Sequence, residues 1–395
     1  MDIRPSHRAQ SVKLSPTLAI TAKAAELRAA GQNILNLAAG EPDFDTPAHV
    51  KLAAIEAINR GFTKYTAVDG TPELRAAIVE KFARENNLEF EPRQILVSCG
   101  CKHSIYNLMQ ALLNEGDEVI IPAPYWVSYP DMTWLAGADP VIIKTHIDHQ
   151  FKITPEQLRG AISRKSRLFI MNSPSNPTGA CYSATELRAL GAILAEHPEI
   201  VIASDDIYEH ILWRGHDFKN ILNACPELGD RVVVLNGVSK AYAMTGWRIG
   251  YAAGPPEIIA AMKKIQSQST SNPTSIAQVA ATAALTGDQS LLQRQCEIFR
   301  ERHEFVVDAL NNIDGVKAMR SDGTFYSFPD MSQIIENRND IDNDVELAEL
   351  LLERAAVAVV PGSAFGAPGC MRVSYATSME ILEQALGQIA AVLNS

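Results

Sequence analysis

One lysine follows a short run of β-branched apolar residues and has an arginine nearby. Residues 232–235 read Val-Val-Val-Leu, Ser239 and Lys240 follow, and Arg248 lies eight residues beyond the lysine. A lysine at the end of a buried strand is partly desolvated, which lowers its pKa toward that of the neutral amine that attacks carbonyl carbons. The planar guanidinium of Arg248 suits a phosphate. On spacing alone, a solvated lysine and a structurally paired arginine remain the alternative.

A predicted strand at 200–206 is apolar until its carboxyl end, where Asp205 and Asp206 stand close to Tyr208. Adjacent strand residues point to opposite faces of a sheet. The two aspartates are therefore not a facing acid–base pair, and the neighbourhood offers no further metal ligands. One carboxylate can instead face a cationic nitrogen of a ligand.

Arg372 stands in the apolar segment MRVSYA (371–376). A buried arginine must find an anion or reach solvent. A structural ion pair and a carboxylate of a ligand both satisfy this need.

A turn of small residues at 98–100 separates a strand at 95–97 from a helix whose apolar positions are 105, 108, 109, 112 and 113. A further strand begins near 118, so we expect a βαβ unit with an anion-binding turn at the helix start. Gly100, Cys101 and Lys102 then lie under a phosphate. Neither GxGxxG nor a Walker loop occurs here, which disfavours nucleotide binding.

Three other positions lie in turns or at strand ends. Trp126 follows the strand that begins near 118, at the ligand edge of the sheet. Asn176 lies in the turn SPSNPTG after a strand at 167–172, and Gly40 lies in a Gly-Glu-Pro loop. Packing, capping and turn formation are the simpler explanations for each of them.

The order of elements predicts an α/β protein of two domains. The chain has 395 residues, 47% of them hydrophobic and 21% charged, which is enough for two cores. We expect a large domain at 47–290, built on a mixed, mostly parallel sheet flanked by helices. Residues 1–46 and 291–395 then form a small α+β domain, in which 316–331 is expected to be a hairpin-like strand pair.

Composition excludes several classes of function. The net charge is −11 and no Lys/Arg-rich run occurs, so we expect neither nucleic acid nor an anionic membrane as a partner. We find no apolar leader and no membrane-length apolar window, which predicts a cytoplasmic protein. The six cysteines form no CxxC pair, so reduced thiols are expected rather than disulfides or a metal site.

Several motifs, in one order along nearly the whole chain, resemble those of the fold-type I pyridoxal 5'-phosphate (PLP) aminotransferases of class I/II. The similarity is greatest to the bacterial aspartate aminotransferase-like branch. The motifs are LAAGEPDFDTP (37–47), YTAVDGTPELR (65–75), PYWVSYP (124–130), NSPSNPTG (172–179), SDDIYE (204–209), SKAYAMTGWRIGY (239–251) and MRVSYA (371–376).

The resemblance implies PLP as cofactor and gives each residue a role toward it. Lys240 would hold the cofactor covalently and move a proton, and Asp205 would keep the ring nitrogen protonated. The remaining contacts implied are Asn176 and Tyr208 at the 3' oxygen, Trp126 against the ring, Gly100, Cys101, Lys102, Ser239 and Arg248 at the phosphate, and Tyr65 at the phosphate of the partner subunit in a homodimer. Many members carry a serine where this chain has Gly237, so Ser239 must carry more of the phosphate.

The same resemblance implies small amino and 2-oxo acids as substrates. Arg372, Gly40, Trp126 and Asn176 would hold the α-carboxylate, while Lys102, Ser15 and Thr17 would receive a second carboxylate. This favours aspartate with 2-oxoglutarate, in ping-pong kinetics, and some members also aminate prephenate. An aromatic or kynurenine-type aminotransferase, or another PLP lyase on the same fold, stays open. A regulator without catalytic activity would need a fused DNA-binding module, for which we find no basic recognition helix.

Overall fold

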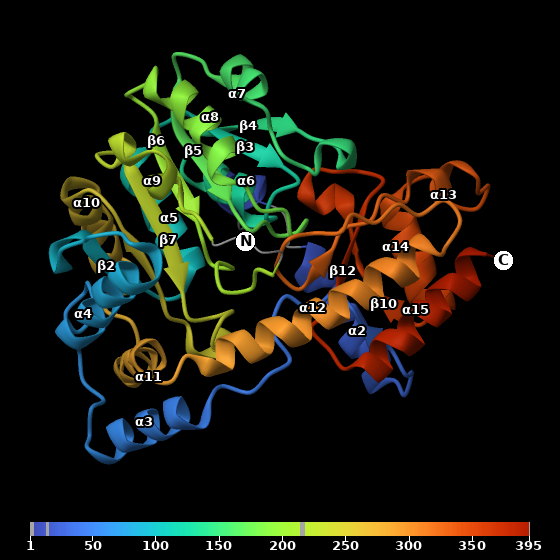
Figure 1. Cartoon of the computed structure of the whole chain (residues 1–395), viewed down its shortest axis with the longest axis horizontal. Helices are drawn as coiled ribbons and strands as arrows, with labels where there is room; N and C mark the ends of the chain where they lie inside the picture. Colours follow the sequence, from blue (N-terminus) through green and yellow to red (C-terminus); the bar gives the residue numbers. More distant parts are fainter. Residues whose placement is uncertain (1–3, 13–15, 214–217, 395) are drawn as a thin grey trace.

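The computed structural model describes residues 4–12, 16–213 and 218–394. A seven-stranded sheet in the order β2-β8-β7-β6-β5-β3-β4 forms its centre (Figure 1). Strands β4, β3, β5, β6 and β7 run parallel, and β8 is antiparallel to both β7 and β2. This confirms the predicted mixed, mostly parallel sheet. Its strands are β2 (Ile95–Ser98), β3 (Glu118–Ala123), β4 (Asp139–Lys144), β5 (Ser166–Asn172), β6 (Val201–Asp205), β7 (Val232–Gly237) and β8 (Gly250–Ala253).

Both faces of this sheet are covered, because successive residues of the central strands alternate between two apolar cores. In β5, Leu168 and Ile170 belong to one core, and Phe169 and Met171 belong to the other. The first core includes residues of α5 (Cys101–Leu112), α6 (Ser128–Leu135) and α10 (Pro256–Ser267). The second includes residues of α3 (Ala48–Asn59), α4 (Pro72–Lys81), α7 (Pro155–Ala161), α8 (Ala184–Ala195), α9 (Ile221–Ala224) and α11 (Ser275–Thr286).

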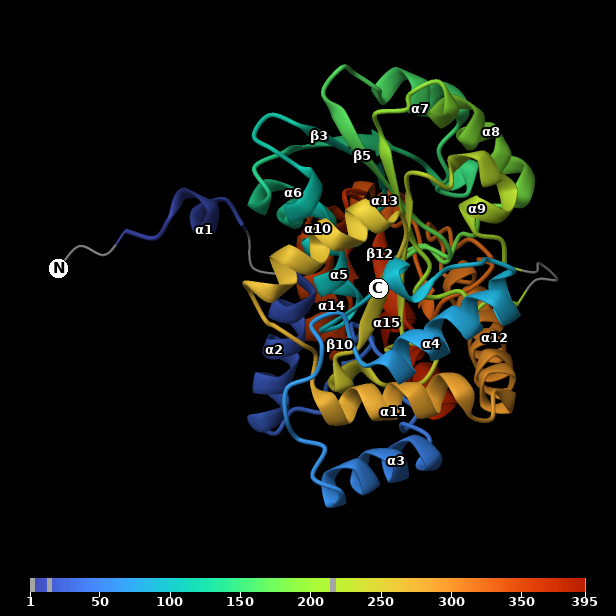
Figure 2. The same ribbon diagram turned by 90° about the vertical axis from the view of Figure 1, so that its left-hand side faces the viewer.

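Helix α12 (Ser290–Asn311) leads away from this sheet to a second group of elements around two further cores (Figures 1 and 2). There β11, β12 and β9 form an antiparallel sheet, and β1 pairs with β10 in parallel. The bounds are α2 (Pro16–Ala29), β1 (Leu35–Asn36), β9 (Tyr326–Ser327), α13 (Ser332–Glu336), α14 (Asp344–Arg354), β10 (Val357–Ala358), β11 (Val360–Pro361), β12 (Met371–Ser374) and α15 (Met379–Leu393).

Short elements complete the described chain. They are α1 (His7–Ser11), the π-helix η1 (Phe82–Asn86) and the 3-10 turns η2 (Pro92–Gln94), η3 (Ile147–His149), η4 (Pro226–Leu228), η5 (Thr245–Trp247) and η6 (Gly362–Phe365). Within the described residues, no helix has the length and apolar character needed to cross a membrane. A cytoplasmic location stays a prediction.

Two expectations about local topology are confirmed in part. Strands β2 and β3 flank α5 as predicted, and four other strands lie between them in the sheet. Within the segment 316–331, a single antiparallel bridge joins Lys317 and Asp330, while its strand β9 pairs with β12. In both cases the local pattern predicts the strands correctly, while partners far along the chain decide the pairing.

Candidate active site

The carboxyl ends of three parallel neighbours, β5, β6 and β7, bring polar residues to one edge of the sheet. In the register of these strands, Asn172 pairs with Asp205, and Asp205 pairs with Leu235. Lys240 comes five residues after Leu235, beyond the end of β7. Ligands of open α/β sheets bind outside this edge.

Lys240 meets a largely desolvated environment there. Its Nζ donates a hydrogen bond to the carbonyl oxygen of Gly40, at 2.6 Å, from the loop that follows β1. Burial, together with the positive charges of Arg372 and Arg248, lowers the pKa of the Lys240 amine to about 8. A minor fraction of this amine is therefore uncharged near neutral pH and available as a nucleophile, and this fraction grows as the pH rises through about 8.

Asp205 and Asp206 point to opposite sides, as the strand pattern predicts. Asp206 accepts a hydrogen bond from Ser204 at 2.7 Å and pairs with Asn220. Asp205 instead accepts from the Tyr129 hydroxyl at 2.6 Å and lies 3.8 Å from the Cys101 sulfur. Burial raises the pKa of Asp205 to about 6, although these donors and the charge of Lys240 oppose the rise.

The start of α5 has the features of an anion-binding site. Gly100 precedes the helix with φ of +89°, no side chain caps it, and the helix begins at Cys101. A Cβ on Gly100 would lie 2.3 Å from the guanidinium of Arg248, so glycine allows this cation to approach the helix start. Free N–H groups, the helix dipole and an arginine together suit a phosphate.

Arg372 is buried, with 2% of its surface exposed. Its guanidinium donates to the Ala38 carbonyl at 2.8 Å and to Asn176 Oδ1 at 3.2 Å, and it lies against the Tyr326 ring at 4.4 Å. No carboxylate of the described residues forms an ion pair with it, and its Nε has no hydrogen-bond partner there. This fits a carboxylate of a ligand rather than a structural ion pair.

One cavity of about 400 Å³ collects these groups. The predicted site residues that line it are Gly40, Cys101, Lys102, Trp126, Asn176, Asp205, Tyr208, Ser239, Lys240, Arg248 and Arg372. Gly100 lies directly behind, at the N-terminus of α5. Tyr65 lies away from this cavity, with 91% of its surface exposed. Ser15 lies outside the described residues, and Thr17 lies in α2, where its side chain is outside the described part.

The structure adds residues that the sequence analysis did not select. Tyr326 and Asn172 line the cavity, and the Tyr326 hydroxyl lies 3.1 Å from that of Tyr208. Tyr129 supports Asp205 from outside the lining. Tyr129 was within reach of sequence reasoning, because it lies three residues after Trp126 in the motif at 124–130. No local sequence pattern marks Tyr326 as a cavity residue.

Comparison with known proteins agrees with this arrangement. A family model described as aminotransferase class I and II matches residues 32–389. The chain belongs to this family.

The aspartate/prephenate aminotransferase of Nitrosomonas europaea is 59% identical over 394 residues, which cover 98% of this chain and 99% of that protein. The crystal structure of an aspartate aminotransferase from Rhizobium meliloti superposes with a TM-score of 0.96 at 47% identity, covering 100% of this chain and 99% of that one. The aspartate aminotransferase of Thermus thermophilus with maleate has a TM-score of 0.93 at 44% identity, covering 99% and 100%.

This aminotransferase is a PLP-dependent enzyme, and its cavity fits the cofactor. The amine of Lys240 complements the aldehyde of PLP, the buried carboxylate of Asp205 complements its ring nitrogen, and the anion-binding start of α5 complements its phosphate. A side chain at Gly237 would not fit, since a Cβ there would lie 2.9 Å from the Ile249 carbonyl oxygen. Glycine at this position therefore follows from the close approach of β7 and β8.

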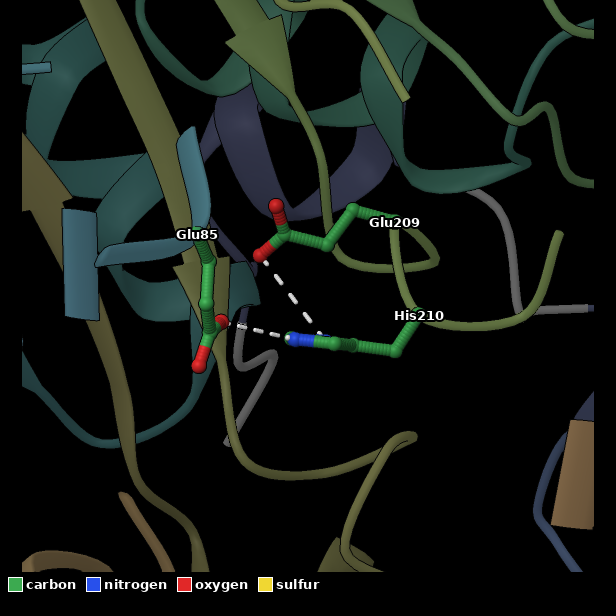
Figure 3. Close-up of side chains that lie close together, drawn as sticks. All are labelled: Glu85, Glu209 and His210. Carbon is green, nitrogen blue, oxygen red and sulfur yellow. Dashed lines mark hydrogen bonds and ion pairs between the residues drawn. The ribbon is translucent and has the colours of Figure 1, made fainter. Parts of the chain in front are cut away.

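A second polar cluster lies apart from the cavity of the aminotransferase. Figure 3 shows Glu85, Glu209 and His210 close together, with the His210 Nε2 2.9 Å from Glu85. Glu209 also pairs with the ammonium group of Lys81, which is fully buried. The geometry resembles a metal site, but the lysine already supplies the positive charge. Burial alone would raise the pKa of Glu85; the bond to His210 and the charge of Lys81 outweigh it and lower this pKa to about 2.

Proposed function

We propose that this aminotransferase moves the amino group of L-aspartate to 2-oxoglutarate, giving oxaloacetate and L-glutamate. The observation that carries the proposal is Arg372, a buried guanidinium with an unpartnered Nε, in the same cavity as Lys240. A substrate whose carboxylate is bound by Arg372 would lie beside the amine of Lys240, which has a lowered pKa. The names of the relatives from Nitrosomonas europaea and Rhizobium meliloti support aspartate as donor.

In the proposed reaction, each polar group has one task. Bound PLP supplies the electron-withdrawing ring that makes the α-hydrogen of the substrate acidic. Lys240 would hold the cofactor covalently through Nζ, and the same nitrogen, as a free amine, would take the proton from the substrate Cα. Asp205 would hold a proton on the ring nitrogen, and Tyr208 and Asn176 would donate hydrogen bonds to the 3' oxygen. Arg372 fixes the α-carboxylate, so that the bond to be broken has one orientation.

The remaining cavity residues divide between the phosphate and the substrate. Cys101 and Lys102 offer backbone N–H groups at the start of α5, Gly100 forms the turn before them with its own N–H bonded to the Ser98 carbonyl at 2.8 Å, and Arg248 and Ser239 add a cation and a hydroxyl. Trp126 would lie against the cofactor ring, and Gly40 would leave room for the substrate carboxylate beside Lys240. The Nζ of Lys102 lies 4.8 Å from the centre of the Trp126 ring, on the cavity wall. We assign to it the second carboxylate of aspartate, helped by Ser15 and Thr17.

Prephenate is a second proposed amino acceptor. The Nitrosomonas europaea relative is named for it as well as for aspartate. Prephenate also carries a 2-oxo acid and a further carboxylate, so the same two cations, Arg372 and Lys102, match its charges. We therefore propose dual use of one cavity rather than a separate site.

A homodimer is the proposed active form. Of the seven exposed large hydrophobic side chains in the described residues, five lie on α3 and the loop after it. They are Leu52, Ile55, Ile58, Phe62 and Tyr65, with exposed fractions of 58%, 51%, 50%, 39% and 91%. Helix α3 lies at the periphery of the molecule, beside α11 (Figures 1 and 2). A second copy would cover this surface and bring Tyr65 to the phosphate of its partner.

A panel of amino donors against 2-oxoglutarate, with prephenate added as an acceptor, tests the proposed function. We expect aspartate and glutamate to be turned over fastest. Faster turnover of aromatic donors would instead support an aromatic aminotransferase. Release of ammonia without an acceptor would support a lyase. Borohydride reduction followed by peptide mass spectrometry should place PLP on Lys240. A Lys240→Ala protein with full aspartate turnover would refute the assignment.

A further inference from the structure

A buried tyrosine outside the cavity lining joins two groups of the proposed cofactor site. Tyr129 lies in the first turn of α6, and 2% of its surface is exposed. Its hydroxyl donates to Asp205 Oδ2 at 2.6 Å, across 76 residues of sequence. Its ring packs edge-on against Trp126, with ring centres 5.4 Å apart at 83°.

We propose that Tyr129 is a positioning residue that acts through Asp205, holding its carboxylate ionised and aimed at the cofactor's ring nitrogen. This inference rests on the proposed function. The tyrosine touches neither substrate nor cofactor in our assignment, and it contributes only by fixing a group that does.

The geometry favours this role over simple packing. A short hydrogen bond from a hydroxyl to a carboxylate is among the stronger kinds in a protein interior. The other donors to Asp205 are weaker, because the Ile207 N–H lies 3.4 Å from Oδ1 and the Cys101 sulfur lies 3.8 Å from it. Tyr129 is therefore the main neutral group that compensates the buried charge of Asp205.

The protonation states around Asp205 agree with a donor role. Burial and the nearby charge of Asp205 raise the pKa of Tyr129 well above its ordinary value, and the same two causes raise that of Cys101. Both groups therefore keep their protons. Of the charged groups near Asp205, Lys240 favours its ionised form, whereas the carboxyl of Asp206 lies on the opposite side of the chain.

Loss of the hydroxyl should have a specific signature. Without it, the pKa of Asp205 rises and the ring nitrogen carries less positive charge. That nitrogen then repels a proton on the lysine-bound nitrogen less strongly, so the pH midpoint of the visible absorption band should move upward. Loss of a hydrogen bond of this kind should lower kcat by about tenfold or more and should change KM little.

The test compares Tyr129→Phe with Tyr242→Phe in the full-length protein loaded with PLP. Tyr242 is a matched control, since it is 1% exposed and its hydroxyl donates to Gln289 at 2.7 Å, away from the cavity. We expect only Tyr129→Phe to lower kcat and shift the absorption midpoint, while both variants melt at similar temperatures. Tyr129→His, which keeps an N–H donor, should recover part of the loss.

The outcomes separate this inference from the function on which it rests. Wild-type protein that neither binds PLP nor transaminates would refute the proposed function. An active wild type together with a Tyr129→Phe protein that matches Tyr242→Phe in kcat and absorption midpoint would refute only the positioning role. If Tyr129→Phe does not fold, a crystal structure of the PLP-bound wild type decides, and a hydroxyl more than about 3.5 Å from Asp205 would overturn the inference.

Discussion

At the scale of single residues, the surroundings of Lys240 set its chemistry. Burial and two neighbouring arginines lower the pKa of its amine from 10.5 to about 8. Only the neutral amine attacks the aldehyde of PLP. We therefore expect the rate at which cofactor-free protein captures PLP to rise with pH through about 8 and to level off above it. Stopped-flow absorbance measures this rate, with Lys240→Ala as the blank. A midpoint near 10.5 would contradict the desolvated environment.

Arg372 offers a second test at this scale. Lysine at this position keeps the charge but loses the planar fork and the contact with the Tyr326 ring at 4.4 Å. We expect Arg372→Lys to lower kcat/KM for aspartate about 100-fold, because two charge-assisted hydrogen bonds weaken. Cofactor binding should change little, since the start of α5 and Arg248 are untouched. Steady-state kinetics and PLP titration measure the two effects, and equal losses in both would argue against a substrate clamp.

Sequence reasoning reaches some of these residues and not others, for a physical reason. The alternation of a strand separates Asp205 from Asp206, and their partners in the structure lie on opposite sides as expected. No such local rule exists for Tyr326, whose ring lies against Arg372 because two strands of a sheet bring them together. The roles of the predicted residues toward PLP stay predictions until the proposed variants are measured.

At the scale of elements, a buried ion pair ties the helical region before β2 to the end of β6. Lys81 in α4 pairs with Glu209, and Glu209 also accepts from Asn86 and from Asn236 of β7, each at 2.6 Å. Glu209 follows Tyr208 directly, so this network fixes the turn that carries Tyr208. Removing one partner of a buried pair leaves the other charge uncompensated.

We therefore expect Glu209→Gln to lower the free energy of unfolding by about 3–5 kcal/mol. The matched control is Glu196→Gln, which breaks the exposed pair of Glu196 with Arg159 and should lower the free energy of unfolding much less. Chemical denaturation of both proteins measures the difference. Equal effects of the two variants would show that Lys81 finds sufficient compensation in Asn86 and Glu85.

Elements were easier to predict than their partners. The strands at 95–97 and 118 and the helix between them follow from local patterns, and the structure contains all three. Their placement with four strands between them does not follow, because strand order depends on contacts between distant segments. The pairing of β9 with β12, instead of within 316–331, has the same cause.

At the scale of the whole molecule, the proposed dimer shares its active sites, and hybrid dimers test this. Lys240→Ala lacks the catalytic amine, and a Tyr65→Ala protein lacks the side chain proposed to reach across. We expect each to be weakly active alone. After unfolding and refolding together, they should regain activity, because one site of each hybrid then has both residues intact. Activity no higher than the sum of the separate proteins would contradict sharing of Tyr65.

The division into domains at 47–290, and at 1–46 with 291–395, also belongs to this scale and stays a prediction. The apolar cores follow this division in part. The cores of the seven-stranded sheet are separate from those around β9 to β12, but the latter also include Phe151, Ile207, Tyr208 and Ile211. Contacts that join the two segments of the small domain cannot be read from periodicity. Asp43, for example, forms two hydrogen bonds of 2.8 Å with Arg302 of α12, across 259 residues of sequence.

The unpartnered Nε of Arg372 has a consequence for the lifetime of the protein. A guanidinium taken out of water with one donor unsatisfied makes the ligand-free fold less stable than it would otherwise be. Any dicarboxylate that satisfies it binds the native chain and not the unfolded one, and so raises the melting temperature. We therefore expect a bound dicarboxylate to slow heat inactivation and proteolysis of this polypeptide, independently of how fast the enzyme turns it over.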